Sequence, residues 1–442
     1  MSGSDMDADT LVIVAIAIVL FAATVLPYIR RLRRTERDNR QRLENSEAAG
    51  LNEPPTLHPI VDPAVCLCSG ACVKACPEGD ILGLISNRPT LLHASRCVGH
   101  GQCAASCPVD AISLVFGTAQ RGIDIPHVQG NFETNVPGIY IVGELGGMGL
   151  IRNALRQGRQ VVDGIAAEKR PTSPEIHDLL VVGGGPAGIA AALTAMEHQL
   201  NFIAIEQEEP GGAVRHYPRQ KLVMTEAMDI PLYGHVELRE ASKERLLELW
   251  QDVFAKTGLQ FNTGERLLKI QREKDFFRVE TSNGEYQTAR VVLAIGRRGT
   301  PRRLGVAGEE LEKVSYKLLE PERFCESRIL VVGGGNSALE IAWALAQQGQ
   351  GNTVTLAHRS SGFANANENN RERIEALDQS GQLEVLLQTE VRQIDEENVL
   401  VETAGTQRTL ENDYVFICIG GQLPLELLHQ VGVSVERKFG QA

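Results

Sequence analysis

Two stretches of the chain share a pattern of strand, glycine turn, helix and strand, and this repeat constrains the fold more than any other feature. The first reads "HDLLVVGGGPAGIAAALTAMEHQLNFIAIEQ" and the second "SRILVVGGGNSALEIAWALAQQGQGNTVTLAHRSS". The small residues of the turns are Gly183, Gly185 and Gly188 in the first stretch, and Gly333, Gly335 and Ala338 in the second. Glycines at this spacing let the backbone close on a pyrophosphate at a helix N-terminus. The sequence therefore predicts an α/β fold with two Rossmann-like dinucleotide-binding domains.

The residues that end the second strand of each stretch differ in charge. Glu206 ends it in the first stretch, where a carboxylate can accept a hydrogen bond from a ribose hydroxyl. The second stretch has His358 and Arg359 there. Because a guanidinium matches a 2'-phosphate through two parallel hydrogen bonds, NADPH is the expected nicotinamide, and NADH is the alternative.

Two further segments, "ARVVLAIGRRGTP" and "DYVFICIGG", follow the stretches as strands that end in glycine. In this order the four segments resemble the thioredoxin reductase class of flavoproteins, in which such crossovers link an FAD domain to a nicotinamide domain. The resemblance implies FAD in the first domain, with Gly296 in the first crossover. It also implies that "GGAVRHYP" lines the isoalloxazine through Gly211, Gly212 and Tyr217. The tyrosine is expected either to stack on the flavin or only to pack.

The segment that closes such flavoproteins lies here ahead of the domain that it should complete. Relatives continue past the second crossover into a strand, a second strand reading "PGIYxxGD" and a helix, whereas this chain stops at "SVERKFGQA". The matching segment, "NFETNVPGIYIVGELGG", precedes the first glycine turn. We therefore expect a circularly permuted flavoprotein. The resemblance implies that Gly143 and Glu144 lie at the flavin, with Glu144 in the place of an Asp that holds the ribityl chain.

The chain lacks the dithiol of the thioredoxin reductases. Those enzymes carry C-x-x-C shortly before the second glycine turn, where "VSYKLLEPERFCESRILVVGGG" has only Cys325. The chain is thus more similar to the thioredoxin-reductase-like ferredoxin–NADP reductases, whose acceptor is an iron–sulfur protein. Two alternatives stay open: a redox sensor or binding protein without turnover, and a disulfide reductase that uses Cys325 and a distant thiol. The sequence assigns no catalytic acid, base or nucleophile.

Seven of the nine cysteines fall in two related half-motifs, "CLCSGACVKACPEGDIL" and "CVGHGQCAASCPVDAIS". The pattern resembles bacterial two-cluster ferredoxins, in which C-x2-C-x2-C-x3-C-P occurs twice and the fourth cysteine of each half binds the cluster of the other half. The resemblance implies two iron–sulfur clusters of the 4Fe-4S type. Their ligands would be one set of Cys66, Cys68, Cys72 and Cys107, and a second set of Cys97, His100, Cys103 and Cys76.

Both halves depart from that family at the second ligand. Ser69 stands where a cysteine is expected, so that Cys68 is offered one position early, and His100 stands at the equivalent place in the second half. Histidine can ligate iron in such clusters and raises their potential. Three alternatives remain open: an open site with a three-iron cluster or an external ligand, a zinc site, and a module that has lost its metal.

Residues Thr10 to Ile29 contain no charged side chain and would span about 30 Å as a helix, the thickness of a bilayer core. Acidic residues precede this segment, and a basic run from Arg30 to Arg34 follows it. The positive-inside rule then predicts a single-pass inner-membrane protein with the N-terminus outside and the catalytic domains in the cytoplasm. A buried core helix is the alternative.

The predicted organisation has seven parts. They are an anchor with its basic stop (1–34), a charged linker (35–58), a two-cluster ferredoxin module (59–116), the permuted part of the FAD domain (117–170), the FAD-binding domain (178–299), the NAD(P)-binding domain (300–420) and a return to the FAD domain (421–442). A net charge of -12 argues against a nucleic-acid partner. The redox partner is left unidentified, and a homodimer is implied by the resemblance alone.

Overall fold

The structure is a computed structural model. It describes residues 8–48, 54, 57–97, 99–119, 122–147, 149–168, 173, 175–217, 222–224, 227–238, 240–297, 300–318, 320–347, 350–363, 366, 368–422 and 424–440. The chain forms two compact units, one of residues 1–54 and 58–114 and the other of residues 55–57 and 115–442.

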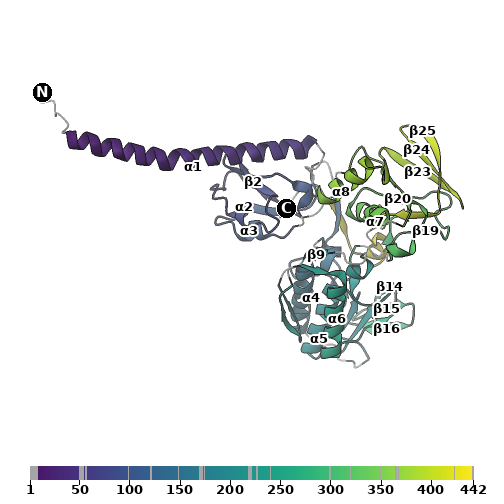
Figure 1. Cartoon of the computed structure of the whole chain (residues 1–442). Helices are drawn as coiled ribbons and strands as arrows, with labels where there is room; N and C mark the ends of the chain where they lie inside the picture. The colour runs from purple at the N-terminus through teal and green to yellow at the C-terminus, as the bar shows by residue number, and fades with distance from the viewer. Residues whose placement is uncertain are drawn as a thin grey trace. The chain divides into compact units, whose positions relative to one another are not determined.

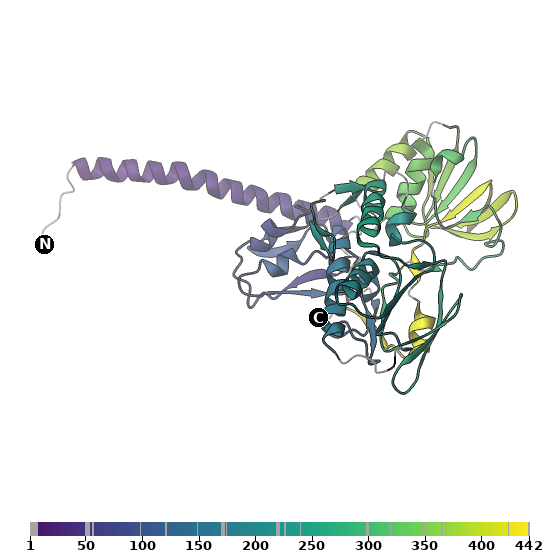
Figure 2. The same cartoon turned by 90° about the horizontal axis from the view of Figure 1, so that it is seen from below.

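The smaller unit combines one long helix with a small α+β module (Figures 1 and 2). Its elements are α1 (Ala8–Ala48), β1 (His58–Val61), α2 (Ala71–Ala75), β2 (Leu82–Ile85), β3 (Arg88–Leu91), α3 (Gln102–Ala105) and β4 (Ile112–Val115). β2 and β3 form an antiparallel hairpin, and β1 pairs with β4. Gly70 and Gly101 precede the two short helices with left-handed φ angles of 69° and 77°. The backbone thus repeats the internal symmetry of the cysteine motifs.

The C-terminal part of α1 packs on the β2–β3 hairpin. The buried Asn39 donates a hydrogen bond from Nδ2 to the carbonyl oxygen of Leu84 (3.1 Å). This fit needs glycine at position 83, because a Cβ on Gly83 would lie 2.8 Å from Nδ2 of Asn39. The carboxylate of Glu36 accepts a hydrogen bond from the Ser86 amide at the hairpin turn (2.9 Å). The first part of the predicted charged linker is thus helical and joins the module, since its polar side chains find partners on the hairpin.

The segment predicted to cross a membrane, Thr10–Ile29, lies within α1. Its side chains at positions 10–12, 14, 15 and 17 are outside the described residues. Across the part of the chain that the structure describes, no helix is long and apolar enough to span a bilayer.

The larger unit contains a five-stranded parallel sheet in the order β13-β8-β7-β17-β6. The strands are β6 (Ile139–Ile141), β7 (Leu179–Val182), β8 (Phe202–Glu206), β13 (Asn262–Thr263) and β17 (Val291–Leu293). β7 is buried along its whole length, as a central parallel strand covered on both faces must be. β6 comes from the segment ahead of the first glycine turn and pairs with β17, with Ile139 opposite Val291. That segment is therefore part of this sheet.

Three helices accompany this sheet: α4 (Ile151–Ala166), α5 (Pro186–Glu197) and α6 (Lys243–Thr257) (Figure 1). α4 and α5 pack very closely, because a Cβ on Gly158 would overlap the carbonyl oxygen of Ala187. Their buried side chains share one hydrophobic core. The helix that follows β6 is thus packed on the helix that the first glycine turn opens.

Short antiparallel elements extend this half of the larger unit. β9 (Leu222–Met224) pairs with β12 (Glu240–Ser242), and β10 (Met228–Ile230) pairs with β11 (Gly234–Val236). A three-stranded sheet consists of β14 (Leu267–Arg272), β15 (Phe277–Thr281) and β16 (Glu285–Thr288).

The other half repeats the plan with a second five-stranded parallel sheet, in the order β19-β26-β20-β21-β22. The elements are β19 (Val314–Ser315), β20 (Arg328–Val332), α7 (Asn336–Gln347), β21 (Thr353–Ala357), α8 (Glu368–Gln379), β22 (Leu383–Leu386) and β26 (Tyr414–Ile417). A three-stranded antiparallel sheet of β23 (Thr389–Ile394), β24 (Asn398–Thr403) and β25 (Thr406–Glu411) lies between β22 and β26 in the chain. In both halves the glycine turn follows a central strand, where the carboxyl ends of parallel strands form a ligand crevice.

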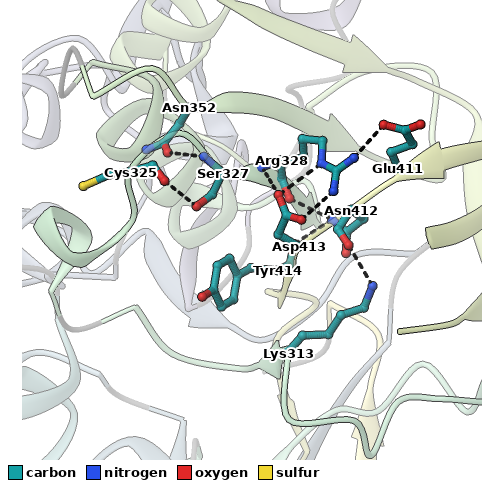
Figure 3. Close-up of polar contacts among 9 residues, drawn as sticks. All are labelled: Lys313, Cys325, Ser327, Arg328, Asn352, Glu411, Asn412, Asp413 and Tyr414. Carbon is teal, nitrogen blue, oxygen red and sulfur yellow. Dashed lines mark hydrogen bonds and ion pairs between the residues drawn. The ribbon is translucent and has the colours of Figure 1, made fainter. Parts of the chain in front are cut away.

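An ion-paired clasp joins the opposite, amino ends of β20 and β26 (Figure 3). The Arg328 guanidinium donates to both carboxylate oxygens of Asp413 (2.7 and 3.1 Å), and its backbone amide donates to the same carboxylate (2.7 Å). Glu411 binds the same guanidinium (2.5 Å). These bonds hold the pKa of Asp413 at about 2, with the hydrogen bonds from Arg328 as the largest cause. The clasp holds β20 and β26 together at the ends opposite to the second glycine turn, which follows β20.

The end of the chain returns to the first half. β18 (Thr300–Pro301) pairs with β27 (Gly421–Gln422), after which come α9 (Leu425–Gln430) and β28 (Val435–Lys438). β28 pairs antiparallel with β5 (Ile123–Pro126), with Val435 opposite Pro126. The last strand thus lies beside the segment that leads into β6.

Candidate functional site

The first glycine turn is closed so tightly that only glycine fits its key positions. Gly183 has a φ of +104°, and a Cβ on it would lie 2.6 Å from the carbonyl oxygen of Ala294 in the first crossover. A Cβ on Gly188 would overlap the carbonyl oxygen of Gly183. The turn therefore brings strand, helix and crossover together and leaves the helix N-terminus open to a phosphate.

The predicted acid and the second glycine pair lie against the same turn. The Glu206 carboxylate accepts a hydrogen bond from the Gly184 amide (2.5 Å). Gly211 and Gly212 have φ angles of +134° and +61°, and a Cβ on Gly212 would lie 2.8 Å from the Gly185 Cα. Residues from three separate segments thus form one cradle.

The segment that precedes the first glycine turn in the chain also contributes to this cradle. Gly143 donates a hydrogen bond from its amide to Oε1 of Gln157 (2.7 Å), and a Cβ on Gly143 would lie 3.1 Å from the Cβ of Ala187 in the first turn of α5. Glu144 follows it, in the short helix of residues 143–146. The structure therefore brings Gly143 to the first glycine turn, and its role at the flavin stays a prediction.

Arg297 is a residue of this region that the sequence patterns do not indicate. It follows Gly296, whose φ is +64°, and its Nη2 donates a hydrogen bond to the backbone carbonyl of Asp124 in β5 (2.9 Å). Burial lowers the pKa of Arg297, while the carboxylates of Glu144 and Asp124 oppose this effect. The first crossover is thus bonded to the segment that carries Glu144. In the sequence, only the position of this arginine directly after the crossover glycine could have indicated it as a residue of the site.

Tyr217 lies at the end of the Gly212–His216 turn and packs beside Val214, Ala241 and Leu246. Its carbonyl oxygen accepts a hydrogen bond from Nζ of Lys243 (2.5 Å). These contacts are compatible with both alternatives for this side chain, which stay predictions.

The second glycine turn has the same construction with a different partner. A Cβ on Gly333, whose φ is +149°, would lie 2.9 Å from the Cβ of the buried Ala338. Gly335 has open space around it. A Cβ on Gly334 would overlap the ring of His358, so the imidazole lies against this turn as the Glu206 carboxylate lies against Gly184.

His358 is held in place by a stacked contact with Phe363, with ring centroids 5.5 Å apart. Burial is the main cause that lowers its pKa, and the charge of Arg359 adds to the effect. Arg359 itself is exposed. In the second half the imidazole of His358 and the exposed guanidinium of Arg359 thus stand where the first half has the Glu206 carboxylate. These groups suit a ribose that carries a 2'-phosphate better than an unmodified ribose.

The cysteines of the smaller unit lie in the small α+β module, where several of the predicted ligands are near one another. Burial raises the pKa of Cys72, and negative charge on Cys66 and Cys107 would raise it further. Burial raises the pKa of Cys97 to about 11, and Cys103 and Cys76 act in the same direction. The fourth cysteine of each half is therefore near the other half's thiols. Bound iron would lower the pKa of these thiols again, because a cation favours the thiolate.

A small cavity supports the second set. It is lined by Cys76, Cys97, His100 and Cys103 together with Gly99, Gly101 and apolar side chains that include Ile81 and Leu82. Backbone amides point at the sulfurs: those of Glu78 and Gly79 at Cys76, and that of Gly99 at Cys97, and each lowers the pKa of its thiol. The donor set and the amides fit an iron–sulfur cluster.

The side chains do not form a site for a single ion. Within the described ranges no three His, Cys, Asp or Glu side chains are close enough together to hold one metal ion. Cys68 has a left-handed φ of 55° and an exposed side chain, and its amide donates to Sγ of Cys66 (3.4 Å). The structure thus places Cys68 beside Cys66.

Two cysteines lie outside the cluster module. Cys325 is exposed in the stretch before β20, where its sulfur turns away from the Arg328 clasp (Figure 3). Cys418 follows β26, and burial raises its pKa to about 12. Neither cysteine forms a disulfide.

Comparison with known families assigns both parts of the chain. The model described as "Pyridine nucleotide-disulphide oxidoreductase" matches residues 180–441, and the model described as "4Fe-4S dicluster domain" matches residues 58–108. Residues 117–168 lie between the two matches.

Several known proteins are similar to the larger part. The ferredoxin–NADP reductase of Ignicoccus hospitalis is 30% identical over 271 residues, which cover 60% of this chain and 83% of that protein. The ferredoxin–NADP reductase of Thermus thermophilus is 30% identical over 272 residues, covering 59% of this chain and 78% of that protein. Among solved structures, the bacillithiol disulfide reductase Bdr of Bacillus cereus has a TM-score of 0.54 at 26% identity, covering 58% of this chain and 82% of that chain.

Proposed function

The chain belongs to the pyridine nucleotide-disulphide oxidoreductase family and is a flavin-dependent NAD(P)H oxidoreductase fused to a 4Fe-4S dicluster domain, and from this premise we propose that electrons pass between NADPH, FAD and two clusters. When bound, the flavin would convert the two-electron chemistry of nicotinamide into the one-electron chemistry of iron–sulfur clusters. We propose a ferredoxin-type protein as the acceptor or donor beyond the clusters, in line with the names of the two relatives.

One observation carries this proposal: the distribution of thiols. Seven cysteines lie in the dicluster domain, while the nicotinamide half has only an exposed Cys325 and a partly buried Cys418, and neither has a partner at C-x-x-C spacing. The clusters are therefore the better exit for electrons. Residues 108–122 alone separate Cys107 from β5, and such a tether keeps two redox groups at high effective concentration.

The residues of the first cradle would bind FAD. Gly183, Gly185 and Gly188 would let the pyrophosphate reach the N-terminus of α5, and Glu206 would accept a ribose hydroxyl in place of the Gly184 amide that it now holds. Glu144 would contact the ribityl chain, and Tyr217 would shield the ring. In the second half, Arg359 would bind the 2'-phosphate of NADPH beside Gly333, Gly335 and Ala338.

We also infer that the flavoprotein part is circularly permuted relative to the named relatives. Two pairings support this: β6 joins the sheet of β7 from upstream, and the final strand β28 pairs with β5. In addition, the family model begins at residue 180, and the alignment with the Ignicoccus relative covers 83% of that protein and leaves the rest unmatched. Residues 117–168 are the natural counterpart of the unmatched part.

The location of the protein remains a proposal from its sequence. The segment from Thr10 to Ile29 would hold the protein in the inner membrane with the redox domains in the cytoplasm, and the exposure of Ile18, Leu20 and Phe21 on α1 is consistent with an apolar surrounding. Fractionation of cells and protease protection of the N-terminus test this. A homodimer is a further proposal, which light scattering of the purified chain tests.

The central experiment is anaerobic purification with counts of iron, sulfide and flavin, followed by stepwise titration with NADPH. The proposal expects flavin and iron together, with bleaching of the flavin followed by reduction of the clusters. The disulfide reductase alternative has support in the similarity to bacillithiol disulfide reductase. It predicts instead new thiols after reduction and a requirement for Cys325. A sensor would reduce its cofactors without sustained turnover.

A further inference from the structure

The cavity lined by Cys76, Cys97, His100 and Cys103 has a carboxylate beside one of its lining residues. Nε2 of His100 lies 3.7 Å from Oε1 of Glu78, and the two side chains are 13% and 28% exposed. Glu78 directly follows Cys76 and Pro77 of the cavity lining, and the cysteine pattern assigns it no role as a ligand.

The internal repeat provides a comparison within the same chain. The run from Cys66 to Ile81 corresponds residue for residue to the run from Cys97 to Ile112. Gly79 and Asp110 occupy equivalent places and both have left-handed φ angles, 76° and 51°, so the backbones correspond as well.

In this comparison His100 corresponds to Ser69, and Glu78 corresponds to Val109. Because the fourth cysteine of each half belongs to the other half's set, Glu78 accompanies the set that contains His100. Val109 accompanies the set next to Ser69. The carboxylate is thus present beside the imidazole and missing where the imidazole is missing.

We propose that His100 binds iron through Nδ1 and that Glu78 is the positioning residue that holds the imidazole for this purpose. The inference rests on the proposed cluster function and specifies the ligating atom. A neutral imidazole carries one N–H. In the proposed arrangement this proton is on Nε2, the nitrogen nearer the Glu78 carboxylate, and the lone pair of Nδ1 is left for the metal. A carboxylate at the second nitrogen also fixes the ring and strengthens histidine as a donor.

The first test identifies the ligand in the full chain, purified anaerobically and reduced. Nitrogen hyperfine coupling to the clusters is measured with natural and with 15N-labelled histidine. We expect a coupling that changes with the label and that His100→Cys abolishes while iron and sulfide contents are retained. A chain that contains iron and sulfide but shows no label-dependent coupling overturns this inference alone. A chain without iron and sulfide overturns the proposed function and the inference with it.

The second test concerns Glu78. Glu78→Val copies the residue of the other half and is expected to weaken iron retention at one cluster about 10- to 100-fold, measured by transfer of iron to a chelator, with FAD content unchanged. Glu78→Gln retains an acceptor oxygen and is expected to lie between this variant and the wild type. Asp80→Asn is the matched control, since this exposed carboxylate pairs with Arg42 (3.2 Å). Equal iron retention and equal nitrogen coupling in Glu78→Val and Asp80→Asn would refute the positioning role.

Discussion

Substitution of Gly158 tests whether the segment ahead of the first glycine turn works as part of the FAD domain. In the structure a Cβ on Gly158 would overlap the Ala187 carbonyl oxygen and lie 3.0 Å from the Ala191 amide nitrogen, whereas ordinary contacts begin at 3.4 Å. The obstructing atoms belong to the backbone of α5 and cannot rotate away. Gly158→Ala must therefore push α4 and α5 apart at the turn that would hold the pyrophosphate.

The size of the effect can be isolated with a second glycine on the same helix. Gly164 has nothing within 4 Å of its added Cβ, so Gly164→Ala gains only the helix preference of alanine, about 1 kcal/mol. Gly158→Ala gains the same preference but also introduces overpacking, which costs about 1–3 kcal/mol. The difference between the two variants thus gives the cost of overpacking alone.

The assay is thermal unfolding, followed both by circular dichroism and by the release of flavin fluorescence. At about 2–4 °C per kcal/mol, we expect Gly164→Ala to melt several degrees above Gly158→Ala. We also expect Gly158→Ala to lose FAD at lower temperature than the wild type, because the displaced atoms lie in the first turn of α5. If both variants were stabilised equally and retained FAD equally, α4 would not pack on α5 in solution, and the reasoning would be refuted.

Other predictions concern the nicotinamide, the clusters and the clasp. Arg359→Ala should raise the KM for NADPH by about tenfold or more and leave that for NADH nearly unchanged, because it removes a bidentate phosphate contact; equal changes in steady-state assays would contradict the assignment. Cys72→Ala and Cys103→Ala should each remove one cluster while NADPH still bleaches the flavin, as iron counts and absorbance spectra would show; retained turnover without iron would make the flavin the exit. Asp413 has a folded pKa of about 2, below its ordinary value of 3.8, so the stability it contributes is present above pH 4 and is lost as the pH falls toward 2. Denaturant unfolding across this range should show a shallower pH dependence for Asp413→Asn, and an unchanged slope would argue against the clasp with Arg328.

The dinucleotide turns could be predicted from the sequence because their geometry leaves few choices. Gly183 and Gly188 are required by backbone atoms that lie where a Cβ would be, and this requirement shows directly as a spacing in the sequence. The dicluster domain could also be predicted, because its cysteines recur at short, regular spacings in the sequence. Hydrophobic strands such as Leu179–Val182 also indicate their own burial.

Features that depend on distant partners could not be predicted in this way. The polar residues of the second part of α1 predict a charged linker. Asn39 is nevertheless buried, because the absence of a side chain at Gly83 leaves room for it on a hairpin distant in the sequence. The sequence shows that His358 stands where the first stretch has the acidic Glu206. It does not show that the imidazole lies over Gly334, because this position depends on the contact with Phe363. The pairing of Arg297 with the Asp124 carbonyl joins residues far apart in the chain.

The pairing of β28 with β5 has a consequence for biosynthesis. A protein folds from its N-terminus as it leaves the ribosome, so β5, β6 and α4 emerge before the sheet that they join, and β5 receives its partner only when the final strand appears. Closing so long a loop is slow, and an unpaired strand is prone to aggregate in the meantime. The dicluster domain, by contrast, has all its cysteines between residues 66 and 107, so it can fold while the rest of the chain is still being made. Nascent chains are therefore expected to depend on chaperones late in synthesis, and loss of the last dozen residues should harm folding far from the C-terminus in sequence.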